Sequence, residues 1–154
     1  MKRIKLAISI LIPLAVGFLG SLFTTPSIGT WYTTINKPAF NPPDWIFFPV
    51  WTTLFILMGI SLYLVWENST KKSGKRSFYI FGIQLTLNLL WSILFFGMHK
   101  PLYALIDIAV LWVAILLTLL EFRKFSKTAS LLLLPYLAWV TFATVLNFSI
   151  VLLN

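Results

Sequence analysis

Few side chains in this sequence could take part in chemistry, and most of them are aromatic or amide groups within long apolar runs. Trp51, Trp91 and Trp139 offer indole rings, which stack on flat aromatic ligands and carry one N–H donor each. Asn88 and Asp107 offer hydrogen-bonding groups, and Asp107 is the only acidic residue inside an apolar run. An ionisable group in such a position is by default a hypothesis of function.

Several common kinds of active site are disfavoured by what the chain lacks. It has no cysteine, so it offers no thiolate nucleophile, disulfide or Cys metal site. Its single histidine, His99, lies in a short turn, and we interpret it as an exposed turn residue. No paired carboxylates, Ser-His-Asp set, Gly-rich phosphate loop or HExxH motif is present. We therefore expect no metal site and no required cofactor.

The apolar runs that carry these side chains predict an all-α integral membrane protein. Of the 154 residues, 59% are hydrophobic and only 10% are charged, which is not typical of a soluble domain. A single membrane domain, 1–154, accommodates five spans of about 20 residues, at about 6–25, 46–66, 78–97, 101–120 and 129–153. The basic start also fits a signal peptide, but we favour a retained first helix because the apolar run is long. Pro135 should kink or loosen the fifth span.

The basic residues predict the orientation of this five-helix bundle. Ten of the twelve Lys and Arg residues lie in the amino terminus and in the 67–77 and 121–128 loops. The other side of the bundle holds only Lys37 and Lys100. By the positive-inside rule the amino terminus is cytoplasmic and the carboxyl terminus lies outside. The same clustering between apolar runs argues that the net charge of +8 does not serve nucleic-acid binding.

The first outer loop, 26–51, differs from the rest of the chain. It contains five of the eight prolines and three of the seven tryptophans. Proline removes backbone donors and disfavours helix, while the aromatic side chains would leave much apolar surface in water unless covered. The loop is therefore either a lid on the outer end of the bundle or a belt of aromatic residues at the membrane interface.

Counting depth from the span ends places the informative side chains of four helices in the outer half of the bundle. Asp107 in this region should face the interior. There it either serves a ligand or only fixes helix packing, being protonated or hydrogen-bonded to Asn88, Gln84 or a neighbouring hydroxyl. Convergence beneath the aromatic loop predicts a ligand cavity. The aromatic or polar stripes on one face of each helix are Trp51, Phe55 and Met58; Gln84, Asn88, Trp91 and Phe95; Tyr103 and Asp107; and Trp139, Ala143, Leu146 and Asn147.

Several short motifs, in order along the whole chain, resemble the translocator protein family, also called the tryptophan-rich sensory protein or peripheral benzodiazepine receptor family. The resemblance covers all five spans. The motifs are Trp31-Tyr32, Lys37-Pro38, Asn41-Pro42-Pro43-Asp44-Trp45, Pro49-Val50-Trp51, Tyr63-Leu64-Val65-Trp66, Gln84-Leu85, Leu87-Asn88, Trp91, Phe95-Phe96-Gly97, Ala104-Leu105-Ile106-Asp107, Pro135-Tyr136-Leu137-Ala138-Trp139 and Leu146-Asn147.

The resemblance implies a homodimeric five-helix bundle in the bilayer, here expected in a bacterial cell membrane. It also implies an outer pocket for tetrapyrroles such as protoporphyrin IX, as ligand or substrate, and for synthetic ligands of the isoquinoline carboxamide or benzodiazepine type. Sterol binding is not carried over, because no basic residue follows Tyr136. The pocket positions carried over are Tyr32, Pro42, Trp51, Asn88, Trp91, Asp107, Trp139, Ala143 and Leu146, with Phe55 from the Trp51 stripe and Tyr103 where animal members have Trp.

Three functions are compatible with such a protein: binding or transport of the tetrapyrrole, its light-dependent breakdown, and service as a sensor or assembly partner of another membrane protein. Trp51 and Trp139 are the hypothesised catalytic residues for photo-oxidative breakdown, because indole is easily oxidised and a stacked macrocycle could touch both. The alternative is that the two side chains only pack.

Overall fold

The structure, a computed structural model, describes residues 1–154 as an all-helical chain without strands. Five helical segments are long and apolar enough to cross a membrane, which confirms the predicted fold class. The elements are α1 (Lys2–Ile28), α2 (Trp31–Thr34), a 3₁₀ turn (Asp44–Ile46), α3 (Phe47–Asn68), α4 (Lys75–Ser92), a π-helical segment (Ile93–Gly97), α5 (Pro101–Arg123), α6 (Lys127–Leu132) and α7 (Leu134–Leu153).

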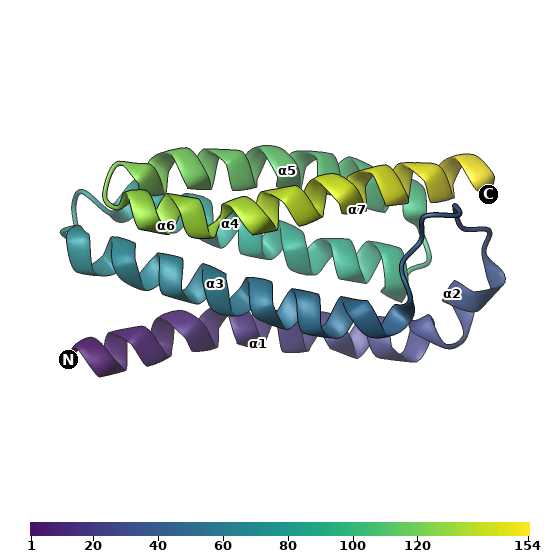
Figure 1. The fold of residues 1–154 in the computed structure, drawn as a ribbon, viewed down its shortest axis with the longest axis horizontal. Helices are drawn as coiled ribbons and strands as arrows, with labels where there is room; N and C mark the ends of the chain where they lie inside the picture. Colours follow the sequence, from purple (N-terminus) through teal and green to yellow (C-terminus); the bar gives the residue numbers. More distant parts are fainter.

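The two termini lie at opposite ends of an elongated bundle (Figure 1). The end with the amino terminus also carries the α3–α4 and α5–α6 connections, so the predicted basic segments gather there. We call this the inner end, and the end that carries α2 and the carboxyl terminus the outer end. Which of the two faces the cytoplasm stays a prediction from the charge bias.

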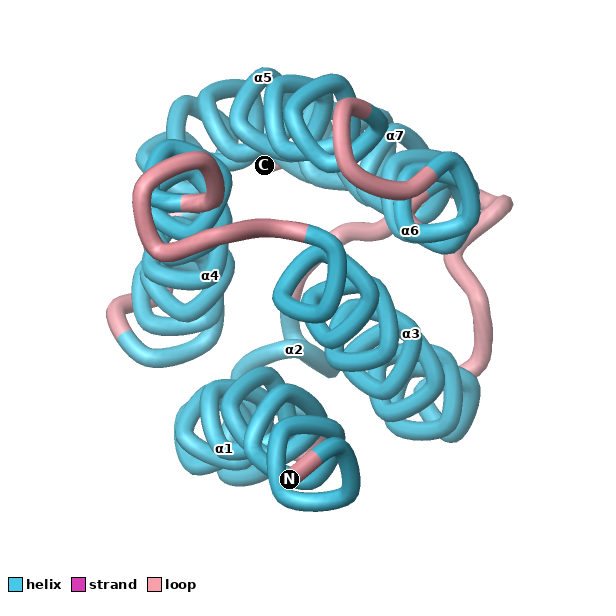
Figure 2. The backbone as a smooth tube through the Cα atoms, turned by 90° about the vertical axis from the view of Figure 1, so that its left-hand side faces the viewer, coloured by secondary structure: helices cyan, strands magenta, loops and turns pink.

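The helices α1 and α5 occupy opposite edges of the bundle when it is viewed along its axis (Figure 2). Helix α1 packs on α3 and α4, whereas α5 packs on α4, α6 and α7. The backbones of α1 and α3 approach closely at Gly59, where a Cβ atom would lie 2.5 Å from Ile10 Cα and 2.8 Å from Ser9 O. Small residues at such crossings let membrane helices pack tightly.

The fifth span is divided at Leu133 into α6 and α7, as Pro135 predicts. The Leu133 N–H bonds to Ser130 O at 3.1 Å, which leaves the Ala129 carbonyl to another donor. The buried Ser61 hydroxyl of α3 donates to this Ala129 oxygen at 2.7 Å. The bond ties α3 to α6 at the inner end, and Figure 1 shows α3 and α7 diverging from there toward the outer end.

Ion pairs reinforce only the inner end. Glu121 of α5 accepts from Lys124 at 2.8 Å and lies 3.4 Å from Arg76 of α4, and Lys5 of α1 lies 3.4 Å from Glu67 of α3. Because these pairs are partly exposed, each contributes little to stability. The Lys5–Glu67 and Arg76–Glu121 pairs join neighbouring helices at the level where basic residues accumulate.

The Gly59 crossing predicts a specific sensitivity to one methyl group. Gly59→Ala should lower the free energy of unfolding by about 1–3 kcal/mol, because the new Cβ meets backbone atoms that cannot move aside. Gly82→Ala on α4 is the matched control, since a Cβ there meets nothing within 4 Å. Thermal unfolding in detergent measures both. Equal unfolding midpoints for the two variants would contradict the close approach.

Candidate functional site

A pocket of about 540 Å³ lies at the outer end, where α3 and α7 have separated. Five parts of the chain line it: α1, the 30–46 segment, α3, α4 with its π-helical extension, and α7. Helix α5 contributes no lining residue. The aromatic lining residues are Phe18, Tyr32, Trp45, Phe47, Phe48, Trp51, Phe55, Trp91, Phe95, Phe96 and Trp139.

Eight of the eleven positions expected from the sequence line this pocket: Tyr32, Trp51, Phe55, Asn88, Trp91, Trp139, Ala143 and Leu146. Pro42, Tyr103 and Asp107 lie outside the lining. Tyr103 and Asp107 belong to α5, which packs against α4 and α7 and so lies behind the pocket wall. Tyr103 is 54% exposed on the outer surface of the bundle. Asp107 is buried in the bundle interior but outside this pocket, whereas Tyr103 points away from the interior.

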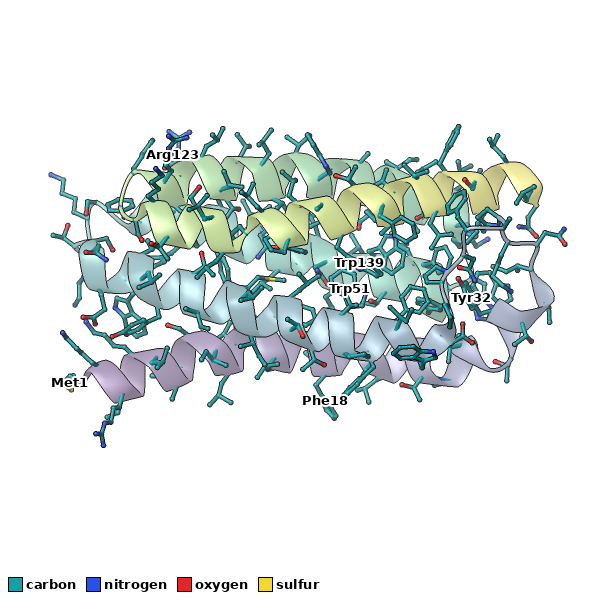
Figure 3. All side chains as sticks on the ribbon, in the orientation of Figure 1. Met1, Phe18, Tyr32, Trp51, Arg123 and Trp139 are labelled. Atoms are coloured by element: carbon teal, nitrogen blue, oxygen red, sulfur yellow. The ribbon has the colours of Figure 1, made fainter.

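Trp51 and Trp139 face the space between α3 and α7 from opposite sides (Figure 3). The Trp51 ring stacks on Phe55 at 5.7 Å, and the Trp139 ring meets Phe47 edge-on at 6.2 Å. The Trp139 Nε1 atom is buried without a hydrogen-bond partner. Such an orphan donor is costly in an apolar interior, so it is available to a polar ligand atom.

Trp91 is held in the wall by a relay of side-chain hydrogen bonds. Its Nε1–H donates to Asn147 Oδ1 at 3.0 Å, and Asn147 Nδ2 donates to the Pro101 carbonyl at 2.9 Å. Beyond Trp91 the helix widens into a π turn, closed by the Met98 N–H to Ile93 O bond of 2.7 Å. The wider turn lets Phe95 stack on Trp91 at 5.0 Å. Nothing in the sequence pattern predicted this π turn, a feature that often accompanies functional sites.

Tyr136 forms a buried polar cluster with two amides of α4. Its hydroxyl donates to Gln84 Oε1 at 2.7 Å and accepts from Asn88 Nδ2 at 2.8 Å. Asp107 makes no hydrogen bond to Asn88 or Gln84, so the hydrogen bond considered for it from the sequence is absent. Asp107 is buried, as predicted for the bundle interior, yet neither of its oxygens has a partner.

The loop 26–51 covers the outer end of the bundle, as predicted for a lid. A belt of aromatic residues at the membrane interface therefore does not account for the whole loop. Tyr32 is only 2% exposed and donates through its hydroxyl to Asn41 Oδ1 at 2.7 Å. Lys37 Nζ donates to the Tyr32 carbonyl at 2.6 Å. Trp45, in contrast, lines the pocket while remaining 72% exposed. We call residues 30–46 the lid.

His99 is an exposed turn residue, as expected from the sequence, and its side chain also contacts the base of the lid. Its ring stacks on Trp31 of α2 with centroids 4.5 Å apart, and its Nε2 lies 3.3 Å from Ser27 Oγ. Its backbone has a φ of 57°, in the left-handed region. The α4–α5 turn thus supports the base of the lid, through a contact between residues far apart in the sequence.

The free edge of the lid is joined to the carboxyl end of α7. Asn36 N donates to Asn154 Oδ1 at 3.0 Å, and Asn154 Nδ2 donates to the Asn36 carbonyl at 2.8 Å. The Asn36 side chain donates in turn to the Leu153 carbonyl at 3.2 Å. The three bonds fix the lid over α7 on one side. On the other side the Tyr32 ring packs on Phe95 and Phe96 of the π-helical segment, with centroids 6.2 and 5.6 Å away.

An elongated helical bundle with an aromatic pocket beneath a proline-rich lid defines a class of multi-pass membrane protein. The TspO/MBR family model matches residues 9–153, and the chain belongs to this family. It is therefore an integral membrane protein. It is 52% identical to a tryptophan-rich protein TspO of Archaeoglobus fulgidus over 154 residues, covering 100% of this chain and 99% of the relative.

Two further relatives show the span of the family. A tryptophan-rich protein TspO of Chlorobaculum tepidum is 53% identical over 152 residues, covering 98% of this chain and 96% of the relative. A translocator protein of Bos taurus is 36% identical over 140 residues, covering 90% and 83% respectively. The similarity therefore extends across all five spans and from archaeal and bacterial to animal proteins.

Tyr32 makes the lid sensitive to alkaline pH. Burial, with a smaller contribution from the Asp44 carboxylate, raises the pKa of Tyr32 from 10.0 to about 12. The folded protein thus holds this proton more tightly than the unfolded chain does, and the stabilisation is complete below pH 10 and lost as pH rises toward 12. Tyr32→Phe should lower stability by about 1 kcal/mol at pH 8. The difference in unfolding midpoint between parent and variant should shrink as pH rises from 10 toward 12; a constant difference over this range would contradict the assignment.

The Asn36–Asn154 contact predicts how firmly the lid is held. Asn154→Ala removes two of its three hydrogen bonds, so amide hydrogen exchange in residues 33–43 should accelerate while exchange in α3 and α5 stays unchanged. Asn68→Ala is the control, because Asn68 makes one side-chain bond, to Leu64 O, at the inner end. Equal lid exchange in the parent and Asn154→Ala would show that the contact does not hold the lid.

Proposed function

We propose that the protein binds tetrapyrroles, with protoporphyrin IX as the representative ligand, in the pocket beneath the lid. The observation that carries the proposal is the lining: indole and phenyl rings from α3, α4, α7 and the lid surround one cavity. Its volume of about 540 Å³ falls within the range of about 300–1,000 Å³ usual for small-molecule sites. Stacking on such walls adds to the free energy of burying a flat macrocycle.

The charge of the lining constrains the orientation of the ligand. Asp44 is the only ionisable acid or base of the lining besides the Tyr32 phenol, and no Lys, Arg or His lines the pocket. The two carboxylates of a porphyrin would find no cation inside, so they should point toward water at the lid. Lys37 lies in the lid, with Nζ 4.7 Å from the Tyr32 ring centroid. Neutral synthetic ligands of the isoquinoline carboxamide or benzodiazepine type fit the apolar lining without this constraint.

The lining also bears on the metal content of the ligand. A tightly held haem needs an axial His, Cys, Met or Tyr, and the lining residues offer no His, Cys or Met. Their one phenol, Tyr32, already donates to Asn41. Metal-free protoporphyrin IX should therefore bind at least as tightly as haem.

Binding beside two tryptophans supports a second proposal, light-dependent breakdown of the pigment. Trp51 and Trp139 both line the pocket, and the Trp139 Nε1 atom has no partner. An excited porphyrin can exchange an electron with indole, and dioxygen is the final oxidant that takes up the electrons lost by the macrocycle. No general acid, base or metal is needed. The rival functions, transport and sensing or assembly with another membrane protein, require the binding but not the light-driven loss.

The test is a titration with protoporphyrin IX in the dark and under light, followed by absorbance and Trp fluorescence. Trp51→Phe and Trp139→Phe each keep an aromatic wall, so saturable dark binding should survive while light-driven loss of pigment slows about tenfold or more. Trp112→Phe is the matched control: Trp112 lies on α5 outside the pocket lining, with its Nε1 bonded to Thr141 at 2.8 Å.

Three outcomes separate the proposals. Absence of saturable dark binding in the parent protein contradicts the tetrapyrrole site. The remaining function is then assembly with another membrane protein. Binding without light-dependent loss supports a carrier or sensor and rejects the breakdown. Light-driven loss of pigment at the same rate in the parent protein and in both pocket variants shows that Trp51 and Trp139 line the pocket without taking part in the chemistry.

A further inference from the structure

The pocket beneath the lid carries a single charged side chain, and that side chain lies at its outer end. Asp44 begins the 3₁₀ turn that leads into α3, and it lines the pocket while remaining exposed. Tyr32 lines the same end, which lies beyond Trp51 and Trp139 toward the carboxyl end of α7 (Figure 3). The part of a ligand that lies under the lid therefore faces a carboxylate.

No cation of the protein is paired with this carboxylate. The ion pairs of the chain lie at the inner end, and Asp44 takes part in none of them. The ammonium group of Lys37 already donates to the carbonyls of Tyr32 and Ile35, at 2.6 and 3.4 Å. Lys100 lies in the α4–α5 turn, and neither lysine belongs to the pocket lining. A ligand in the pocket thus meets a net negative charge at the lid.

The helix ends around the lid do not offset this negative charge. Helix α1 ends at Ile28, which lines the pocket, and its last turn contains no basic residue. The carbonyl groups at the carboxyl end of a helix carry a partial negative charge. The amino end of α3 carries a partial positive charge, but Asp44 lies in the turn immediately before it and offsets that charge.

The Tyr32 phenol illustrates how an anion is disfavoured at this end of the pocket. Burial is the larger cause that raises the pKa of Tyr32 to about 12, and the Asp44 carboxylate adds to the rise. Loss of the phenol proton would place a negative charge beneath the lid, and both effects oppose it. A ligand carboxylate at the same place would be repelled by the same Asp44 side chain.

A cationic group would instead find two favourable partners at the lid. Trp45 follows Asp44 in the chain, and it too lines the pocket and is largely exposed. A carboxylate forms a charge-assisted hydrogen bond with an ammonium group, and the face of an indole ring attracts it as well. The two consecutive side chains therefore suit a protonated amine.

We propose that Asp44 determines which polar group a ligand places beneath the lid: a protonated amine binds there most tightly, a neutral group less tightly and a carboxylate least tightly. The class of ligand that fits best is a flat aromatic ring system with an ammonium group at one edge. The proposal rests on the binding of a flat ring in the pocket, which is the function proposed above, and adds the charge of the ligand to it. Protoporphyrin IX, a dianion, binds through its ring and against the effect of Asp44.

The test uses three ligands that share the protoporphyrin ring and differ in the charge of two side chains. They are protoporphyrin IX, its neutral dimethyl ester, and its bis-amide with N,N-dimethylethylenediamine, whose tertiary amines are protonated at neutral pH. Titrations are carried out in the dark, in one detergent, and followed by Trp fluorescence. Each comparison is made between the parent protein and a variant with the same ligand, so that differences in solubility among the ligands cancel.

Asp44→Asn should tighten the binding of protoporphyrin IX about fivefold, weaken that of the cationic bis-amide about fivefold and leave that of the ester unchanged. A fivefold change corresponds to about 1 kcal/mol, the interaction of two unit charges about 4 Å apart in water. In about 1 M salt both changes should shrink, because the Debye length falls to about 3 Å.

Two further variants serve as controls for this charge effect. Glu67→Gln removes the same charge at the inner end of α3, outside the pocket lining, and should change none of the three affinities. Asp44→Glu keeps the carboxylate and should keep the order of affinities of the parent protein.

The direction of the changes separates charge recognition from a structural effect. A loosened lid would weaken all three ligands together, whereas loss of the Asp44 charge changes the affinities for the anion and the cation in opposite directions. Changes in one direction for all three ligands, or equal affinities in the parent protein and Asp44→Asn, overturn the role of Asp44 alone. Absence of saturable binding of all three ligands by the parent protein rejects ring binding in the pocket, and this proposal with it.

Discussion

The buried hydrogen bond from Ser61 to the Ala129 carbonyl fixes where the bundle is closed and where it can open. In a membrane every backbone group needs a partner within the protein. The break before Pro135 leaves the Ala129 oxygen without its usual donor, and Ser61 supplies one at 2.7 Å. This bond, with the close α1–α3 approach at Gly59, holds the inner half together. The outer halves of α3 and α7 are free to diverge, and the space between them is lined by aromatic side chains.

The pocket follows from that divergence together with the polar groups that bound it. Tyr136, Gln84 and Asn88 satisfy one another, so their cluster fixes the separation of α4 and α7 without exposing polar atoms to lipid. Toward the outer end from this cluster, aromatic rings line the space between the helices. The lid is held to the bundle by the Tyr32 ring, which packs on Phe95 and Phe96, and by the Asn36–Asn154 hydrogen bonds. The pocket is thus largely preformed, and a ligand that enters it would lose little free energy in ordering the protein.

The sequence predicted the features that depend on composition and local chemistry. The lengths of the apolar runs predicted the five spans, and Pro135 predicted the break in the last one. The clusters of Lys and Arg predicted which connections lie at the same end of the bundle as the amino terminus. The sequence did not predict which residues of α5 line the pocket, nor the contacts between residues far apart in the chain. The family resemblance placed Tyr103 and Asp107 of α5 among the pocket positions, whereas α5 contributes no residue to the pocket lining. The contacts of His99 with Trp31 and of Asn36 with Asn154 join residues that no spacing rule relates.

Where a tetrapyrrole lies in the bundle can be measured directly. A protoporphyrin derivative that carries a photoreactive diazirine would be bound in the dark, activated briefly and located by peptide mass spectrometry. We predict labels on the outer halves of α3, α4 and α7, around Trp51, Trp91 and Trp139, that are lost when unlabelled protoporphyrin IX competes. Competable labels on the exposed surface of α5, at Tyr103 and Ile106, would contradict a binding site beneath the lid.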